Sequence, residues 1–158
     1  MEMILTEAPL TCVHASLAML TGLSLDSLAI SLPVYFPFPP PYEKVPAGQD
    51  MANVCEWAWE VARIGLMPFD RCPAVAIGPG KPAVPIWEDG EKKWRHQLGY
   101  GPGLLEGSTE RLSDGVLLNT GHMCAWDGER IFDPRGYRYA WKDRKDHKFD
   151  AERFWLKV

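Results

Sequence analysis

The chain has 158 residues, which is the length of one domain, and its 46% apolar and 24% charged residues are typical of a globular protein. Its net charge of −4 provides no basic surface for nucleic acid, and no apolar run approaches the roughly 20 residues of a membrane helix. The start of the chain is acidic at Glu2 and Glu7 and lacks the basic region of a secretory signal, so we expect a cytoplasmic protein with four reduced cysteines.

Helical signals occupy the first 65 residues. Apolar residues recur every three to four positions after Thr11, a residue type that caps helices, and Gly22 is typical of a helix end. Ser24 is a second candidate cap. The patterns predict three helices, over residues 11–20, 25–32 and 49–64.

Two further features belong to this part of the chain. The 33–48 segment holds six prolines and predicts an extended loop, which could cover a groove beside Cys12 or simply wrap the sheet. Trp57 and Trp59 cannot share one face of the third predicted helix, so one of the two should meet a loop or solvent.

The second half of the chain changes to the two-residue period of strands. Gly99 to Gly103 is predicted as a turn or flexible loop. The expected strands cover residues 74–77, 83–87, 115–118, 122–126, 130–132 and 154–158, with 137–141 as a further candidate. Helices followed by strands predict an α+β fold in which N-terminal helices pack on an antiparallel sheet. We expect a single domain, 1–158, with a helical part of about 11–65 and a sheet part of about 72–158.

The segment from His122 to Asp133 is the sharpest local signal. Asp127-Gly128 between two alternating runs predicts a two-residue turn that pairs Trp126 with Glu129 and places His122 opposite Asp133. Side chains directly opposite each other share a face, so this carboxylate could hydrogen-bond the imidazole, fix its tautomer and raise its basicity. A polar pair at a sheet edge, with no further role, is the alternative.

Cys12 is the candidate nucleophile for such a pair. It falls at the start of the first predicted helix, where free N–H groups favour a thiolate and could stabilise an oxyanion. The alternative is a buried cysteine acting as a small apolar residue. That alternative suits Cys55, Cys72 and Cys124, although Cys124 shares the predicted face of His122 and could line the site.

A zinc site is a different interpretation of the same residues. Cys12-x-His14 and His122-x-Cys124 offer two thiols and two imidazoles. Cys12 and His14 would point about 200° apart on a helix, so we expect no metal and no other cofactor. His96 and His147 lie in polar stretches and should be exposed.

The sequence TCVHASLAMLTG at residues 11–22, with Gly121-His122 and Asp133-Pro134 much later, resembles the papain-like cysteine peptidases. The nearest branch is the bacteriocin-processing (double-glycine leader) peptidase group with its small bacterial and phage relatives. The resemblance covers about 25 residues in the family's order of cysteine, histidine and aspartate.

The resemblance implies a papain-like fold and a hydrolase of peptide or isopeptide bonds, with Cys12 as nucleophile, His122 as base and Asp133 as the residue that orients it. The family's oxyanion glutamine, usually about six residues before the cysteine, has no counterpart, because Thr6 stands there. Thr6 and Thr11 are the candidate donors or site-lining residues, and Gln49 and Gln97 lie far away in sequence.

Other functions fit the same residues. A thiol acyltransferase or deamidase would use the same three groups. The missing glutamine also allows a weakly active or inactive module that binds and modulates a host protein, as phage and mobile-element proteins do. The expected partners are therefore a peptide or protein substrate or a host protein, without nucleic acid or membrane, and the sequence does not determine an oligomeric state.

Overall fold

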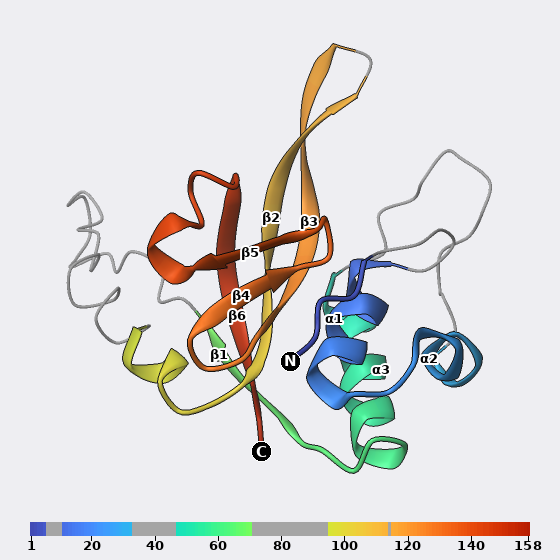
Figure 1. Ribbon diagram of the computed structural model, residues 1–158. Helices are drawn as coiled ribbons and strands as arrows, with labels where there is room; N and C mark the ends of the chain where they lie inside the picture. The colour runs from blue at the N-terminus through green and yellow to red at the C-terminus, as the bar shows by residue number, and fades with distance from the viewer. Residues whose placement is uncertain (6–10, 33–46, 71–94, 114) are drawn as a thin grey trace, which may run out of the picture.

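The computed structural model describes residues 1–5, 11–32, 47–70, 95–113 and 115–158 (Figure 1). The strands expected at 74–77 and 83–87 lie outside the described residues. So do Thr6, Cys72 and residues 33–46 of the expected proline-rich loop; Ala47 and Gly48, at its end, belong to a helix.

The three predicted helices are present, as α1 (Cys12–Thr21), α2 (Leu25–Ser31) and α3 (Ala47–Glu60). Thr11 is the N-cap of α1, and Gly22 ends it in the left-handed conformation at φ 76°. The Ser24 side chain accepts the Ser27 N–H at the start of α2. These boundaries follow local signals, and the prediction for α1 and α2 is confirmed.

The end of α3 was predicted four residues too late. Arg63 adopts a left-handed φ of 57°, and the Ile64 N–H donates back to the Ala58 carbonyl, which closes the helix before Gly65. As a result Val61, expected on the buried face, is 49% exposed. Trp57 is buried and Trp59 is exposed, as the helix geometry required.

Within the described residues, six antiparallel strands form one sheet in the order β1-β6-β2-β3-β4-β5. Their bounds are β1 (Leu66–Asp70), β2 (Gly103–Ser113), β3 (Val116–Trp126), β4 (Arg130–Asp133), β5 (Tyr137–Ala140) and β6 (Phe149–Lys157), with a 3-10 turn, η1 (Trp141–Asp143), after β5. The chain is therefore a single α+β domain. The expectations at 115–118 and 122–126 are two parts of β3, and Trp141 begins η1 instead of ending a strand.

Two strands were not predicted. β1 contains Pro68 and lies at the edge of the sheet, where the missing N–H is tolerated, so the sheet begins at Leu66 and not near residue 72. β2 begins at Gly103, which was expected to lie in a loop. It pairs with β3, which follows it after only two residues, and with the distant β6. The Asp114-Gly115 step in the sequence is a local hairpin signal that the prediction did not use.

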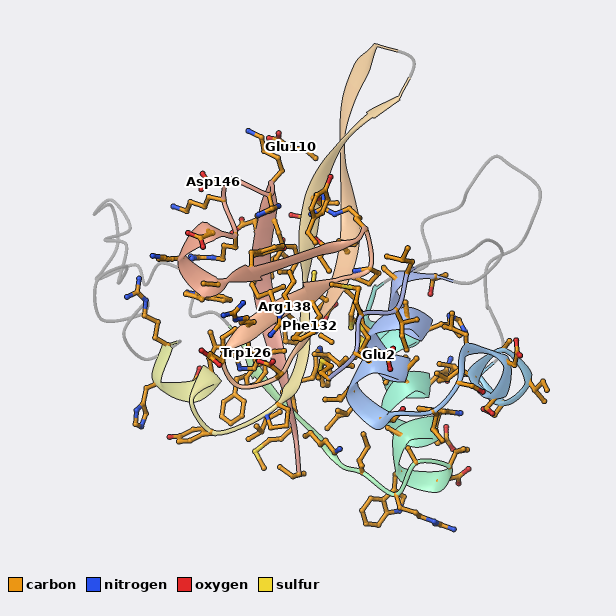
Figure 2. The ribbon with its side chains drawn as sticks, viewed as in Figure 1. Glu2, Glu110, Trp126, Phe132, Arg138 and Asp146 are labelled. Carbon is orange, nitrogen blue, oxygen red and sulfur yellow. The ribbon has the colours of Figure 1, made fainter. Side chains whose placement is uncertain are left out.

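The sheet buries both faces, and each face has its own core. Leu104 and Met123 pack with the three helices, which gather on one side of the sheet (Figure 1). Their neighbours Leu105 and Cys124 point to the opposite face, where the sheet curls around a second core that includes Trp126 (Figure 2). Because side chains alternate along a strand, His122 lies on the same face as Cys124.

Among the described residues no single helix is long and apolar enough to cross a membrane. Only α1 and α2 taken together have that length and composition, and they are bent by 118° at the break between them.

Candidate active site

The hairpin that carries His122 has a different register from the predicted one. Ala125 pairs with Phe132 and Trp126 with Ile131, so the turn lies one residue later than expected. The Asp127 carboxylate accepts the N–H groups of Glu129 and Arg130, which places Asp127 before the turn and not in it. Gly128, at φ 105°, then takes the first central position.

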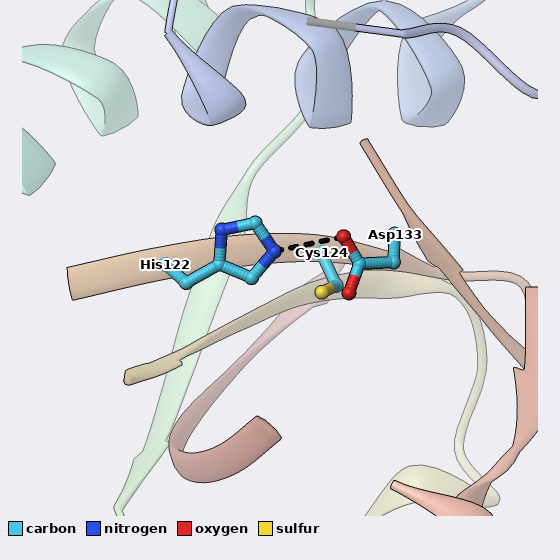
Figure 3. Close-up of side chains that lie close together, drawn as sticks. All are labelled: His122, Cys124 and Asp133. Carbon is cyan, nitrogen blue, oxygen red and sulfur yellow. Dashed lines mark hydrogen bonds and ion pairs between the residues drawn. The ribbon is translucent and has the colours of Figure 1, made fainter. Parts of the chain in front are cut away.

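Continuing this register puts Asp133 opposite Cys124 and diagonal to His122. A shift of two residues keeps every side chain on its face, so the predicted partners still share one face of the sheet. His122 Nε2 lies 2.9 Å from Asp133 Oδ1 (Figure 3). The predicted contact between these two side chains is therefore present, although the predicted pairing was wrong.

α1 positions Cys12 beside this pair. The Ser16 hydroxyl, fully buried, donates to the Met123 carbonyl over 3.0 Å and ties α1 to β3 next to His122. Cys12 is one helical turn before Ser16 and so lies on the same face of α1. Its side chain is near enough to the His122 imidazole to raise the pKa of that ring. Because Nε2 contacts Asp133, Nδ1 is the ring nitrogen left to face a thiol. In Figure 3 Nδ1 points toward the helical layer.

These contacts make His122 unusually basic. Burial disfavours the charged imidazolium, but hydrogen bonds to Asp133 and to Cys12, together with their charges, outweigh it and raise the pKa of His122 from 6.5 to about 9. His122 therefore carries a proton at neutral pH. Its ring also meets Phe149 edge-on, with 5.8 Å between centroids.

Asp133 is fully buried and stays ionised. Burial alone would raise its pKa, but hydrogen bonds from His122 and from Arg135 lower the pKa well below its usual range. The Tyr139 hydroxyl donates to Oδ2 over 3.1 Å. Arg135 and Tyr139 were not singled out in the sequence, although the Asp133-Pro134-Arg135 step is a local signal for a side chain that bonds the backbone two residues on.

Cys124 lines the site without the properties of a nucleophile. It is fully buried, and burial and the charge of Asp133 raise the pKa of its thiol, so it stays protonated. His122, Cys124 and Asp133 offer ligand atoms within 4.8 Å of one another. A metal would have to displace the bidentate Arg135 guanidinium from Asp133, and the donor set therefore fits a hydrogen-bonded cluster better than a metal site.

His14, a candidate ligand in the zinc interpretation that was set aside, is engaged elsewhere. Its Nδ1 lies 2.9 Å from the Thr11 hydroxyl and its Nε2 lies 2.9 Å from the Leu32 carbonyl oxygen. Both ring nitrogens are thus used, and the side chain is buried in the join of α1 and α2. His96 is exposed as expected, whereas His147 stacks on Tyr139 at 4.0 Å between ring centroids.

The candidate oxyanion donors are only partly described. Thr11 is at the start of α1, but its hydroxyl contacts His14. Thr6 lies outside the described residues, as does the side chain of Gln49. Gln97 is in the segment whose Leu98 carbonyl accepts the Trp126 indole N–H, across the sheet from α1 (Figure 1). The backbone N–H groups of Cys12 and Val13 have no carbonyl partner within the helix, as in any first turn.

Comparison with models of known families, with curated proteins and with solved structures found no match to this chain. The case for a function therefore depends on the chemistry of Cys12, His122 and Asp133.

Proposed function

We propose that the protein is a papain-like cysteine hydrolase that cleaves a peptide or isopeptide bond. The observation that carries the proposal is the His122 imidazole, whose Nε2 lies 2.9 Å from Asp133 Oδ1 and whose pKa is raised by both Asp133 and the nearby Cys12 side chain. A nucleophile, a base and a residue that orients the base are the minimum set for this chemistry.

Each group has one role in the reaction. Cys12 Sγ attacks the carbonyl carbon of the scissile bond and forms a C–S bond. The C–N bond then breaks, and the leaving amine takes the proton from His122. Water attacks the resulting thioester, His122 accepts a proton from that water, and the C–S bond breaks to release the acid and return the sulfur. Asp133 holds the ring and stabilises its protonated form.

The start of α1 favours the charged steps. Cys12 is the first residue of α1, so the unpaired N–H groups and the positive end of the helix dipole lie beside its sulfur. There they could stabilise the oxyanion that develops on the carbonyl oxygen of the substrate. Ser16 fixes the helix relative to β3, so the distance between Cys12 and His122 is set by packing and not by a loop. This support comes from the described residues and requires no glutamine.

Alkylation by iodoacetamide tests the proposal, because the chain carries its own comparison. Cys12 and Cys55 are both half-buried. Among the described residues Cys55 has no such imidazole partner, and burial raises the pKa of its thiol. At about pH 6.5 we expect iodoacetamide to label Cys12 selectively, at least about 10-fold faster than Cys55. His122→Ala should remove this preference, and His96→Ala, at an exposed position, should leave it unchanged.

Equal labelling of Cys12 and Cys55, or labelling insensitive to His122→Ala, would refute the proposal. Where Cys12 is selectively labelled, a peptide library read by mass spectrometry tests the reaction itself. Products of hydrolysis that disappear in Cys12→Ala support the function. A binding module would show no cleavage, and products formed only when an amine is added would indicate acyl transfer instead.

A further inference from the structure

Arg135 binds the Asp133 carboxylate, which orients His122. Its Nε lies 3.0 Å from both oxygens of Asp133, and its Nη2 lies 2.6 Å from Oδ2. Its backbone N–H donates to Oδ1 over 2.9 Å. Asp133 Oδ1 therefore accepts hydrogen bonds from His122 and Arg135, while Oδ2 accepts hydrogen bonds from Arg135 and Tyr139.

Arg135 is itself held in place from two sides. Nη1 donates to the Thr109 hydroxyl of β2 over 2.7 Å, and Nη2 donates to the His147 carbonyl over 2.9 Å. Its side chain is 30% exposed, whereas that of Asp133 is fully buried. The guanidinium thus reaches from the surface to an internal carboxylate, in the fork geometry that arginine provides and lysine does not.

The charges along this chain of contacts alternate. A Cys12 thiolate, the His122 imidazolium, the Asp133 carboxylate and the Arg135 guanidinium would sum to zero. Without Arg135 the other three groups would carry one net negative charge beside His122. Such a charge would hold the imidazolium proton too tightly for a base that must also work in its neutral form.

We propose that Arg135 is a positioning residue of the site, which holds both oxygens of Asp133 and takes up part of their charge so that His122 can release its proton. The role of Arg135 in catalysis rests on the proposed hydrolase function, whereas its contacts with Asp133 are independent of that function. Its consequence is that the thioester-hydrolysis step, in which neutral His122 must accept a proton from water, depends on Arg135.

The other groups that face this pair do not supply a competing charge. Cys124 from β3 and Tyr139 from β5 are buried, and burial together with the charge of Asp133 raises the pKa of each, so both stay neutral. Phe149 from β6 is uncharged, and Cys12 approaches from α1. Within the described part of the chain, His122 and Arg135 are therefore the cations that contact Asp133.

The experiment measures the pKa of His122 by NMR titration of its ring in three variants. Arg135→Gln removes the charge and should raise the pKa of His122 by about 1 unit. Arg135→Lys keeps the charge and should stay near the wild-type value. Arg138→Gln is the matched control, because Arg138 is exposed on β5 and stacks over Phe132, 5.1 Å from the ring centre, without contacting Asp133 (Figure 2).

Kinetics provide an independent measurement. A rise of about 1 unit would lower the fraction of neutral His122 at pH 7.5 about 10-fold, so hydrolysis should slow by about that factor while alkylation of Cys12 changes less. A pKa of His122 that is unchanged, or that falls toward 6.5, would overturn the inference. If no peptide is cleaved but the pKa still rises, the proposed function fails and the role of Arg135 stands.

Discussion

The contacts of His122 predict a specific pH dependence of stability. Its pKa rises from 6.5 in an ordinary environment to about 9 in the folded protein, and its side chain is only 7% exposed. A shift of about 2.5 units corresponds to roughly 3 kcal/mol, at 1.36 kcal/mol per unit. The part of the lowered Asp133 pKa that His122 causes reflects the same attraction and is not added to it.

The sign follows from which state binds the proton more tightly. The folded protein keeps the proton of His122 up to about pH 9, while the unfolded chain loses it near pH 6.5. The stabilisation is therefore complete below pH 6.5 and is lost as the pH rises through about 9. Other groups also titrate in this range, so the quantity to follow is the difference between wild type and His122→Gln.

Urea unfolding at about pH 6 and about pH 9.5 measures that difference. The advantage of wild type over His122→Gln should shrink by roughly 3 kcal/mol between the two conditions. His96→Gln, at an exposed histidine, should follow wild type at both. A difference between wild type and His122→Gln that stays constant with pH would refute the reasoning, because it would mean that folding leaves the proton affinity of His122 unchanged.

Two further substitutions test how the fold holds the site. Ser16→Ala should lower the free energy of unfolding by about 1–2 kcal/mol, because it removes a buried hydrogen bond to Met123. It should also slow the alkylation of Cys12. A loss of stability with the alkylation rate unchanged would show that Ser16 does not position Cys12. Gly107→Ala should lower the free energy of unfolding by more than about 3 kcal/mol in the same urea assay, because its Cβ would overlap the Asp150 backbone on the neighbouring strand. A decrease below about 1 kcal/mol would show that the backbone at the bulge between Glu106 and Gly107 can move to make room.

Local chemistry explains where sequence reasoning worked. Gly22 and Ser24 set helix boundaries through contacts within a few residues, and both were identified. The His122–Asp133 contact was found for a partly wrong reason: the turn was placed one residue early, which changes the pairing by two. Because strands repeat every two residues, the error left both side chains on the correct face, whereas a shift of one would have separated them.

The predictions that failed depend on contacts between distant segments. β1 pairs with β6, and Gly65 exchanges backbone hydrogen bonds with Val158, the last residue of the chain as given and more than half its length away. That pairing gives Gly65 a role in the sheet, where a Cβ would crowd the Val158 side chain, so it does not end α3 as its residue type suggested. Arg135 was missed for a similar reason, since its anchors on Thr109 and His147 come from β2 and from the turn before β6.

The buried cluster of His122, Asp133 and Arg135 is better explained by a role in a reaction than by a contribution to stability. A fully buried carboxylate between two cations pays a desolvation penalty that its attractions only offset, and apolar residues of similar volume often stabilise a core equally well or better. The second core, on the same face of the sheet, consists of such residues, including Ile131 and Phe149. Stability alone therefore does not explain why Asp133, His122 and Arg135 occupy this position. A site that must hold a basic imidazole against a thiol does explain it, and it predicts that apolar replacement of all three would preserve the fold and abolish selective alkylation of Cys12.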